Sequence, residues 1–416
     1  MPDPLSDTPV RVLHLITLFS LGGATENTLL TVEGLQQLGY DVEIITGPPI
    51  ASEGDMFAEA RARGVRVKVI QILKRSIHPL LDARAFVRVF WMIREGRYQI
   101  VHTHSSKAGV LGRLAARLAG VPVVVHTIHG LPFHDFMSAA PRRLFILAER
   151  LGTSMSDRVI SVTDTIIRKC ISAGIGSPEK FVTVRSGFEM DPYLRPAGDA
   201  VALRQSYGIG PQEVVVGNIG RFNALKGHQY LIDIIPDVVK EVPNVRFVLI
   251  GSGELEEELK ERVRQRGVSD RVIFTGRVDQ DRIPLFIAMM DILVHTSLRE
   301  GLARVLPQAL AAGIPAVSFD LDGAHEVIRD GITGRLVTAC DQERLCRALI
   351  DLLKNPDQAR SMGATGREIV RHTWTVEAMV RGVDEVYRQL LERKGLLASG
   401  PGEPPRLKKN ARGSRS

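Results

Sequence analysis

The chain has 416 residues, of which 44% are hydrophobic and 24% are charged, and its formal net charge is +7. This length suggests two or three domains, each able to bury its own core, in an ordinary globular protein. The three cysteines, Cys170, Cys340 and Cys346, exclude a disulfide framework and a cysteine metal site, which fits a reducing compartment.

The two ends of the chain are polar. The first ten residues contain no basic segment followed by an apolar one, so no secretory signal is expected. No run reaches the roughly 18 apolar residues that span a bilayer. The last sixteen residues carry five basic side chains and one Glu, so they hold +4 of the total charge, and +3 remains for the rest. We expect a cytoplasmic protein with a disordered, solubilising tail over residues 396–416.

Short apolar runs alternate with segments of helical period along the chain. In the first half, strands are predicted at 11–18, 41–46, 65–72, 99–103, 122–127, 158–162 and 181–184, with helices such as 25–38 and 107–119 between them. In the second half, strands are predicted at 213–219, 246–250, 272–274, 292–295, 316–319 and 334–337. A Pro-containing linker at 189–201 separates the halves, and a helix is predicted at 375–393. This alternation predicts an α/β protein with two doubly wound parallel sheets.

The stretch from residue 293 to residue 328 carries the clearest site pattern. A strand ends in a polar turn, a helix is predicted from Leu302, and a second strand ends in another polar turn. Ligands of parallel sheets bind at such strand ends, where Glu300 can accept hydrogen bonds from sugar hydroxyls and Gly301 allows close approach. On a continuous helix, Gln308 would lie about 12 Å from Glu300, which suits one extended ligand. Equally, Glu300 is explained as a helix-start carboxylate stabilised by the helix dipole.

The first strand of each half is also followed by candidate residues. Gly22 and Gly23 follow the first strand, where they either let the backbone approach a phosphate or sugar or form a plain tight turn. Arg221 and Lys226 follow the first strand of the second half. They offer a bidentate fork and a point charge to a diphosphate, or they are two solvated basic residues.

Several histidines end apolar strands in the first half. His126 and His129 are candidates for bonding a sugar hydroxyl or moving a proton, although a structural role is the commoner one. His102 and His104 lie on one side of a strand, because side chains alternate along it. Since no third ligand is apparent beside them, the sequence does not predict a metal site.

The stretch that begins at Glu300 resembles the donor-site signature of the GT-B glycosyltransferases of family 4. That signature is a Glu followed by Gly, a second Glu eight positions after the first, and then a strand and a Gly-rich turn before another Glu. Glu300-Gly301 and Glu326 match it, whereas Gln308 stands in place of the second Glu. In the family that Glu holds the ribose hydroxyls, and Gln can still accept and donate hydrogen bonds there without a charge.

The resemblance implies the GT-B fold, two Rossmann-like doubly wound domains facing a cleft. It implies an acceptor domain at 1–190, a nucleotide-sugar donor domain at 201–372, and a C-terminal helix at 373–395 that packs back on the first domain. The tail at 396–416 lies outside this fold.

The resemblance also implies the roles of the site residues. Arg221 and Lys226 would bind the diphosphate and stabilise the leaving group, and His129, with His126 as the alternative, would contact the sugar near the reacting carbon. Glu300 would hold the sugar hydroxyls. The remaining donor contacts would come from Gly22, Gly23, Val278, Gly301, Leu302, Gln308 and Glu326.

These roles define a retaining glycosyltransferase that moves a sugar from a nucleotide-diphosphate sugar, UDP-linked for preference, to a glycan or lipid-linked acceptor. Cell-surface polysaccharide or glycoconjugate synthesis is the expected setting. No cofactor or metal is expected, because no acidic D-x-D-like pair is present where one is needed and the cationic residues can take that part. Two alternatives stay open: a nucleotide-sugar epimerase of similar fold, and a non-catalytic carbohydrate- or nucleotide-binding relative.

Two segments suggest a surface role. Residues 84–94 and 136–151 mix aromatic, aliphatic and basic side chains. They are either interfacial helices that meet an anionic membrane or, as base rates favour, core helices with a basic rim. Peripheral contact with the inner face of a membrane is therefore a hypothesis, and no nucleic-acid partner is expected.

Overall fold

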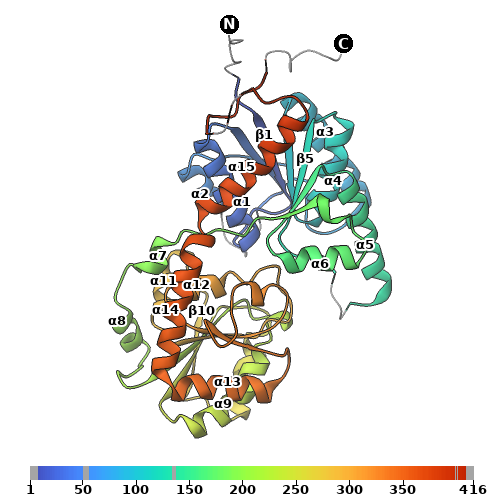
Figure 1. Cartoon of the computed structure of the whole chain (residues 1–416). Helices are drawn as coiled ribbons and strands as arrows, with labels where there is room; N and C mark the ends of the chain where they lie inside the picture. Colours follow the sequence, from blue (N-terminus) through green and yellow to red (C-terminus); the bar gives the residue numbers. More distant parts are fainter. Residues whose placement is uncertain (1–7, 50–55, 134–136, 399, 401, 409–416) are drawn as a thin grey trace. The chain divides into compact units, whose positions relative to one another are not determined.

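Two parallel β-sheets, each flanked by helices, organise the chain (Figure 1). The computed structural model describes residues 8–49, 56–133, 137–398, 400 and 402–408. The chain divides into unit 1, which is Met1–Phe188 with Val376–Ser416, and unit 2, which is Glu189–Thr375. The two parallel sheets with surrounding helices confirm the predicted α/β class.

Unit 1 contains a seven-stranded sheet in the order β3-β2-β1-β4-β5-β6-β7. Its strands are β1 (Arg11–Ile16), β2 (Asp41–Thr46), β3 (Arg66–Val69), β4 (Ile100–His104), β5 (Val123–Ile128), β6 (Arg158–Ser161) and β7 (Phe181–Thr183). Its helices are α1 (Gly23–Gln37), α2 (Phe57–Ala62), α3 (Pro79–Gly96), α4 (Ser106–Leu118), α5 (Ala139–Ser154), α6 (Asp164–Ser172) and α15 (Val376–Arg393). The expected strand at 65–72 is shorter, because β3 ends at Val69.

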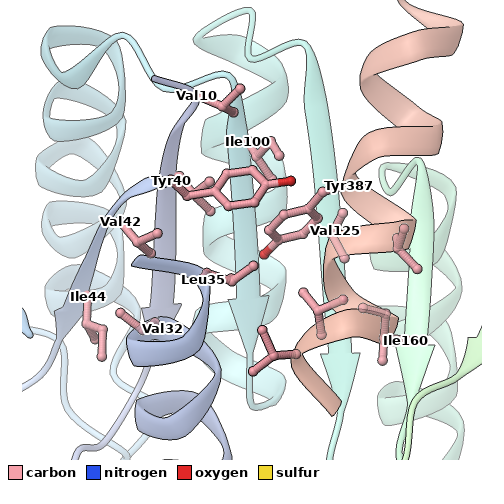
Figure 2. Close-up of a cluster of buried hydrophobic side chains, with 14 of the residues drawn as sticks. Val10, Val32, Leu35, Tyr40, Val42, Ile44, Ile100, Val125, Ile160 and Tyr387 are labelled. Carbon is pink, nitrogen blue, oxygen red and sulfur yellow. The ribbon is translucent and has the colours of Figure 1, made fainter. Parts of the chain in front are cut away.

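Helices cover both faces of this sheet, so the side chains of its central strands are buried on both sides. Val12 and Ile16 of β1 pack in one cluster with α1 and α15, whereas Leu13 and Leu15 pack in another with α3 and α4. Figure 2 shows the first cluster, in which Tyr387 reaches from α15 toward the sheet. Helix α15 follows unit 2 in the sequence, yet its apolar stripe is buried against α1.

The tail is a correction to the sequence prediction. Leu397 forms an isolated β-bridge with Leu407, and Arg406 forms one with Pro9. Both leucines are buried in the first cluster of unit 1, so this part of the expected tail is ordered. Two separated leucines in a polar segment gave no periodic signal, but each gains stability by leaving water. Residues 409–416 lie outside the described part of the chain.

Unit 2 contains a six-stranded sheet in the order β10-β9-β8-β11-β12-β13. Its strands are β8 (Val214–Ile219), β9 (Val245–Ile250), β10 (Val272–Gly276), β11 (Ile292–His295), β12 (Ala316–Phe319) and β13 (Gly334–Val337). Its helices are α7 (Asp191–Leu194), α8 (Ala200–Ser206), α9 (His228–Glu241), α10 (Glu256–Gln265), α11 (Ile283–Ala288), α12 (Val305–Ala311), α13 (Gln342–Lys354) and α14 (Pro356–Thr373). The expected linker at 189–201 contains α7 and the start of α8. None of the described helices is long and apolar enough to cross a membrane.

Candidate functional site

The candidate site of unit 2 lies where the strand order reverses direction. Within the sheet, β8 and β11 are neighbours. Strands β9 and β10 lie beyond β8 on one side, and β12 and β13 lie beyond β11 on the other. In open parallel sheets, the crevice beyond the carboxyl ends of two such strands is the usual ligand site. Lys226 lies in the segment that follows β8, and Glu300 in the segment that follows β11.

Backbone contacts join these two segments. Leu298 donates its N–H to the carbonyl of Leu225 at 2.8 Å, and the Thr296 hydroxyl donates to the carbonyl of Lys226 at 3.2 Å. Gly227 has a φ of 63°, and a Cβ at this position would overlap the Thr296 carbonyl oxygen. Only glycine fits this close approach, which holds the Lys226 segment against the Glu300 segment.

Lys226 and Glu300 form an ion pair at the rim of the sheet, between Nζ and Oε1. The Ser297 hydroxyl donates to the same carboxylate oxygen at 3.0 Å. The two charged side chains are 27% and 22% exposed, so a ligand can reach both of them. The structure therefore places a cation and a hydrogen-bond-accepting carboxylate side by side.

Asp322 fixes the backbone at Glu300. Its Oδ2 accepts the Glu300 N–H at 2.6 Å, and its own φ is 52°, a left-handed value that Asp tolerates better than most residues. Glu300, Ser297 and Asp322 line a partly open pocket, together with His295. Sequence reasoning gave no role to Ser297, His295 or Asp322. Asp322 could have been noticed, because it ends the polar turn after the next strand.

The histidines under this rim are neutral at physiological pH. Burial, then the nearby Lys226 charge and His228, lower the pKa of His295 to about 3. Burial and Lys226 lower the pKa of His228 to about 4. His295 Nε2 lies 3.6 Å from Glu300 Oε1, but an uncharged imidazole makes no ion pair there. Lys226, and not His295, therefore forms the ion pair with the Glu300 carboxylate.

The helix predicted from Leu302 begins later than expected. α12 starts only at Val305, so Glu300, Gly301 and Leu302 lie in the loop before it. The bond from the Glu300 N–H to Asp322 accounts for the difference, since it holds this residue in the loop. The expectation that Glu300 and Gln308 lie on one helix, from which the distance of about 12 Å was derived, is therefore wrong. Gln308 lies in α12 and is half-buried.

The remaining candidates of unit 2 surround this centre. Arg221 is exposed and lies 3.6 Å from the Glu254 carboxylate, so it is not part of the Lys226–Glu300 pair. Val278 follows β10 and is half-buried, and Glu326 ends a short 3-10 helix after β12. Among the predicted residues, the structure brings Lys226 and Glu300 into direct contact.

Unit 1 carries the other predicted residues. Gly22 and Gly23 are exposed at the start of α1, and a Cβ at Gly22 would meet open space. His129 follows β5 and is half-buried, whereas His126 is 2% exposed and bonds Thr103. A ligand can therefore reach His129 more readily than His126.

Each half of the chain matches a known protein family. Residues 200–369 match the family of glycosyl transferases group 1, and residues 22–187 match the glycosyl transferase 4-like domain. A putative glycosyltransferase of Bacillus subtilis, EpsD, is 30% identical over 279 residues, which are 65% of this chain and 71% of EpsD. The chain belongs to the group 1 glycosyltransferases.

Two further relatives differ in the donor that their names state. The UDP-Gal:α-D-GlcNAc-diphosphoundecaprenol α-1,3-galactosyltransferase of Escherichia coli is 25% identical over 344 residues, 82% of this glycosyltransferase and 87% of the relative. A GDP-mannose-dependent phosphatidylinositol monomannoside mannosyltransferase of Mycobacterium tuberculosis is 27% identical over 336 residues, 79% and 85% of the two chains.

A solved structure shares the fold. Anabaena HepE, crystallised with UDP and glucose, superposes with a TM-score of 0.80 at 22% identity, over 91% of this glycosyltransferase and all of HepE. The likeness confirms the predicted GT-B fold. Family and relatives together show that the protein is an enzyme, a glycosyltransferase that uses a nucleotide-sugar donor.

Proposed function

We propose that this glycosyltransferase transfers a sugar from a UDP-sugar, with retention of configuration, to a glycan or lipid-linked acceptor. The observation that carries the proposal is the Lys226–Glu300 pair at the strand-order reversal of unit 2. In a nucleotide sugar, a phosphate is attached directly to a hydroxyl-bearing ring. A cation beside a hydrogen-bond-accepting carboxylate matches these two groups in the same order.

The pair also suits the chemistry of the transfer. As the bond between the sugar and the diphosphate breaks, negative charge grows on the departing phosphate. Lys226 stabilises this charge in the transition state, and Arg221 adds a second cation from the same segment. Because the carboxylate of Glu300 is then free of Lys226, it accepts hydrogen bonds from the sugar hydroxyls. These two cations do the work that a metal ion does elsewhere, so the proposed reaction requires no metal or other cofactor.

The residues of unit 1 are assigned to the reacting end of the donor. His129 contacts the sugar near the anomeric carbon, and Gly22 and Gly23 admit the diphosphate beside the backbone. The half-buried position of His129 and the open space at Gly22 support these roles. In unit 2, Val278 contacts the base, Gln308 the ribose, and Gly301, Leu302 and Glu326 complete the donor site.

The choice of UDP rests on two likenesses. The Escherichia coli relative is named for UDP-galactose, and the structural neighbour was crystallised with UDP. The mannosyltransferase relative is named for GDP-mannose, so the base is the first property to test.

The proposal of a lipid-linked acceptor rests on an exposed surface of unit 1. Helix α4 packs between α3 and α5, and the three helices expose an apolar face. Its members are Leu80, Val87 and Trp91 of α3, Leu114 and Leu118 of α4, and Leu144, Leu147 and Leu151 of α5, which are 38–74% exposed. Exposed Arg84, Arg88, Arg143 and Arg150 lie on the same helices. We call this surface the α3–α5 face.

An anionic lipid surface is the partner that the α3–α5 face fits. Apolar side chains enter the acyl boundary while the arginines meet lipid phosphates, and each buried CH₂ contributes about 0.8 kcal/mol. The relative that acts on a diphosphoundecaprenol-linked sugar supports an acceptor held at such a surface. The proposed location is therefore peripheral, at the inner face of a membrane.

Vesicle binding tests the α3–α5 face. Vesicles that contain phosphatidylglycerol should co-sediment the wild-type protein, and Trp91→Glu should weaken this binding about tenfold, because it places a carboxylate in the acyl boundary. Ile332→Glu is the matched control, since Ile332 is 53% exposed, like Trp91 at 50%, but lies in unit 2. Equal binding by the two variants would remove the membrane role.

A donor screen tests the reaction itself. The purified protein is incubated with UDP-, GDP-, ADP- and CMP-sugars, and binding and slow nucleotide release are recorded. Selective binding of a UDP-sugar with slow release of UDP supports the proposal. Selective binding of a GDP-sugar corrects the base. Altered sugar without nucleotide release indicates an epimerase, and no binding of any donor contradicts the proposed function.

A further inference from the structure

Unit 1 contains a continuous series of hydrogen-bonded rings beneath His129, here named the histidine chain. It links His129 Nε2 to His104 Nδ1 at 2.9 Å, His104 Nε2 to His14 Nδ1 at 2.9 Å, and His14 Nε2 to Tyr387 Oη at 3.1 Å. It continues from Tyr387 Oη to His102 Nδ1 at 2.6 Å and ends from His102 Nε2 to Thr127 Oγ1 at 2.7 Å.

The sheet assembles this chain from distant segments. Strands β1 and β4 are neighbours where the strand order of unit 1 reverses, and His14 pairs directly with His102 in their register. Because side chains alternate along a strand, His104 falls on the same face as His102. Tyr387 reaches this face from α15, next to Tyr40 (Figure 2). The histidine chain therefore connects His129, which follows β5, to helix α15.

The four inner members of the histidine chain that titrate are buried and uncharged. His14, His102, His104 and Tyr387 are at most 1% exposed. Burial and the nearby His129 lower the pKa of His14 to about 3, and burial with neighbouring histidines holds the pKa values of His102 and His104 well below their usual range. Burial raises the pKa of Tyr387 well above its usual value, so its hydroxyl keeps its proton.

Neutral members can be hydrogen-bonded in only a few ways. A neutral imidazole has one N–H donor and one acceptor nitrogen, and a tyrosine hydroxyl has one hydrogen. Both ring nitrogens of His14, His102 and His104 are used, so each ring donates at one nitrogen and accepts at the other. If Tyr387 donates to one histidine and accepts from the other, all links point the same way along the chain.

Thr127 decides which way the links point. If the Thr127 hydroxyl donates to His102, each later member donates to the next one, and His104 finally donates to His129 Nε2. In the reverse direction the Thr127 hydrogen would have no acceptor among the described residues, although this side chain is 4% exposed. A buried donor without a partner is costly, so the first direction is favoured.

We propose that the histidine chain sets the proton position of His129, making Thr127, Tyr387 and His104 positioning residues for the transfer reaction. His129 then keeps its ring proton on Nδ1 and acts on the substrate as a hydrogen-bond donor rather than as a base. The part concerning the reaction rests on the proposed function, whereas the proton position is a property of the protein alone.

A metal centre is the alternative use of these side chains. His14, His102 and His104 each offer a nitrogen, and the three nitrogens lie within 4.8 Å of one another, so the missing third ligand of the sequence analysis is His14. However, a metal ion such as zinc binds each histidine nitrogen at about 2.0–2.1 Å, through a lone pair that is not used in a hydrogen bond. Here all six nitrogens are engaged in hydrogen bonds, and His14 bonds His104 directly. The hydrogen-bond pattern therefore favours a proton-positioning chain.

The test uses the full-length protein with ¹⁵N-labelled histidine. Long-range ¹H–¹⁵N correlation spectra distinguish protonated from unprotonated ring nitrogens, and His129→Gln assigns the His129 signals. We expect His129 to carry its proton on Nδ1 in the wild type. In Tyr387→Phe the link between His14 and His102 is lost, so both directions become similar in energy and His129 should show mixed tautomers.

Tyr40→Phe is the matched control. Tyr40 lies in the same buried cluster, and its hydroxyl donates to Asp384 of α15 at 2.7 Å, outside the chain. It should keep the wild-type tautomer and turnover within about twofold, whereas Tyr387→Phe should lose at least about tenfold in turnover. If Tyr387→Phe does not fold, Thr127→Val breaks the chain at its other end and should also mix the tautomers.

Several results would overturn the proposal. These are a wild-type His129 protonated on Nε2, a His129 tautomer unchanged by Tyr387→Phe or by Thr127→Val, mixed tautomers with unchanged turnover, and one equivalent of zinc or copper in the purified protein by elemental analysis. Failure of the donor screen would remove the proposed function alone, because the tautomer spectra are read without any substrate.

Discussion

Each of the two sheets has a point where its strand order reverses, and the side chains near that point differ in chemistry between the two units. In unit 2 the residues that follow β8 and β11 are charged and partly exposed, and Lys226 pairs with Glu300. In unit 1, His14 of β1 and His104 of β4 are buried, neutral imidazoles joined to one another. The difference teaches that a strand-order reversal offers a site without fixing its chemistry. Under the two proposals, the side chains of unit 2 meet a ligand's charge, and those of unit 1 fix the position of a proton.

Removing the charge of unit 2 should have the largest effect. Lys226→Ala leaves the departing diphosphate without its adjacent cation, so turnover should fall about 10²- to 10³-fold while the melting temperature stays close to that of the wild type. Steady-state nucleotide release with acceptor present measures this change.

Lys260→Ala controls for the loss of an ordinary surface lysine. Lys260 is 33% exposed and pairs with Glu256 and Glu257 in α10, so its environment resembles that of Lys226 at 27%. Its turnover should stay within about twofold of the wild type. Similar losses of turnover in Lys226→Ala and Lys260→Ala would show that the charge of Lys226 has no particular role in the reaction.

The next largest effect is expected at low pH, which should destabilise unit 1 more than unit 2. The pKa of His14 is lowered to about 3 in the folded state, so the unfolded state binds more protons below its usual pKa of about 6.5. The stability that a neutral His14 contributes is therefore fully present above about pH 6.5 and is lost as the pH falls toward 3. His102, His104 and His126 act in the same direction, whereas unit 2 has His228 and His295.

Single-tryptophan variants can read the two units separately. The chain has two tryptophans, Trp91 in unit 1 and Trp374 in unit 2. Urea titrations of Trp374→Phe and Trp91→Phe between pH 6.5 and 4 should show a fall in midpoint about twice as large when Trp91 is the reporter. An equal fall, or a larger one from Trp374, would contradict the contrast between the edges.

Substitution of Asp322, which holds the Glu300 loop, should have a smaller effect than substitution of Lys226. Asp322→Ala removes the acceptor of the Glu300 N–H and puts alanine at a left-handed φ, so the donor KM should rise about tenfold. Asp322→Asn keeps an acceptor oxygen and tolerates this φ, so it should restore most of the affinity. Asp320→Ala is the control, because this exposed carboxylate bonds His325 in the same turn. An Asp322→Ala enzyme with wild-type KM would remove Asp322 from the site.

The smallest effect is expected at Gln308. Gln308→Glu restores the charge that the family pattern has at this position, and a charge-assisted hydrogen bond to a ribose hydroxyl is the stronger kind. Calorimetry should show donor affinity unchanged or up to about threefold tighter. A clear loss of affinity would mean that Gln308 contributes something that a carboxylate cannot.

Most of the fold could be predicted from the sequence, because parallel strands buried on both faces are read as short apolar runs. Every predicted strand is present, from 11–18 to 334–337, with shifts of a few residues at the ends. Two local predictions were wrong where tertiary contacts decide. The bond from Glu300 to Asp322 delays the start of α12, and burial of Leu397 and Leu407 orders part of the tail.

The sites differ in how far the sequence reveals them. Lys226 and Glu300 each follow a strand and carry a charge, so position and chemistry could be read together. His14 lies inside the apolar run Arg11–Ile16 and gives no signal of its own. Its pairing with His102 depends on the order of strands, and its bond to Tyr387 spans 373 residues. Periodicity along the chain carries neither kind of information.

A crystal structure of the enzyme with a UDP-sugar would test the central claim most directly. The proposed function predicts the diphosphate within hydrogen-bond distance of Lys226 and the sugar hydroxyls on the Glu300 carboxylate, with the Lys226–Glu300 pair opened. A diphosphate bound away from Lys226, or a Lys226–Glu300 pair that stays closed beside the bound donor, would contradict it.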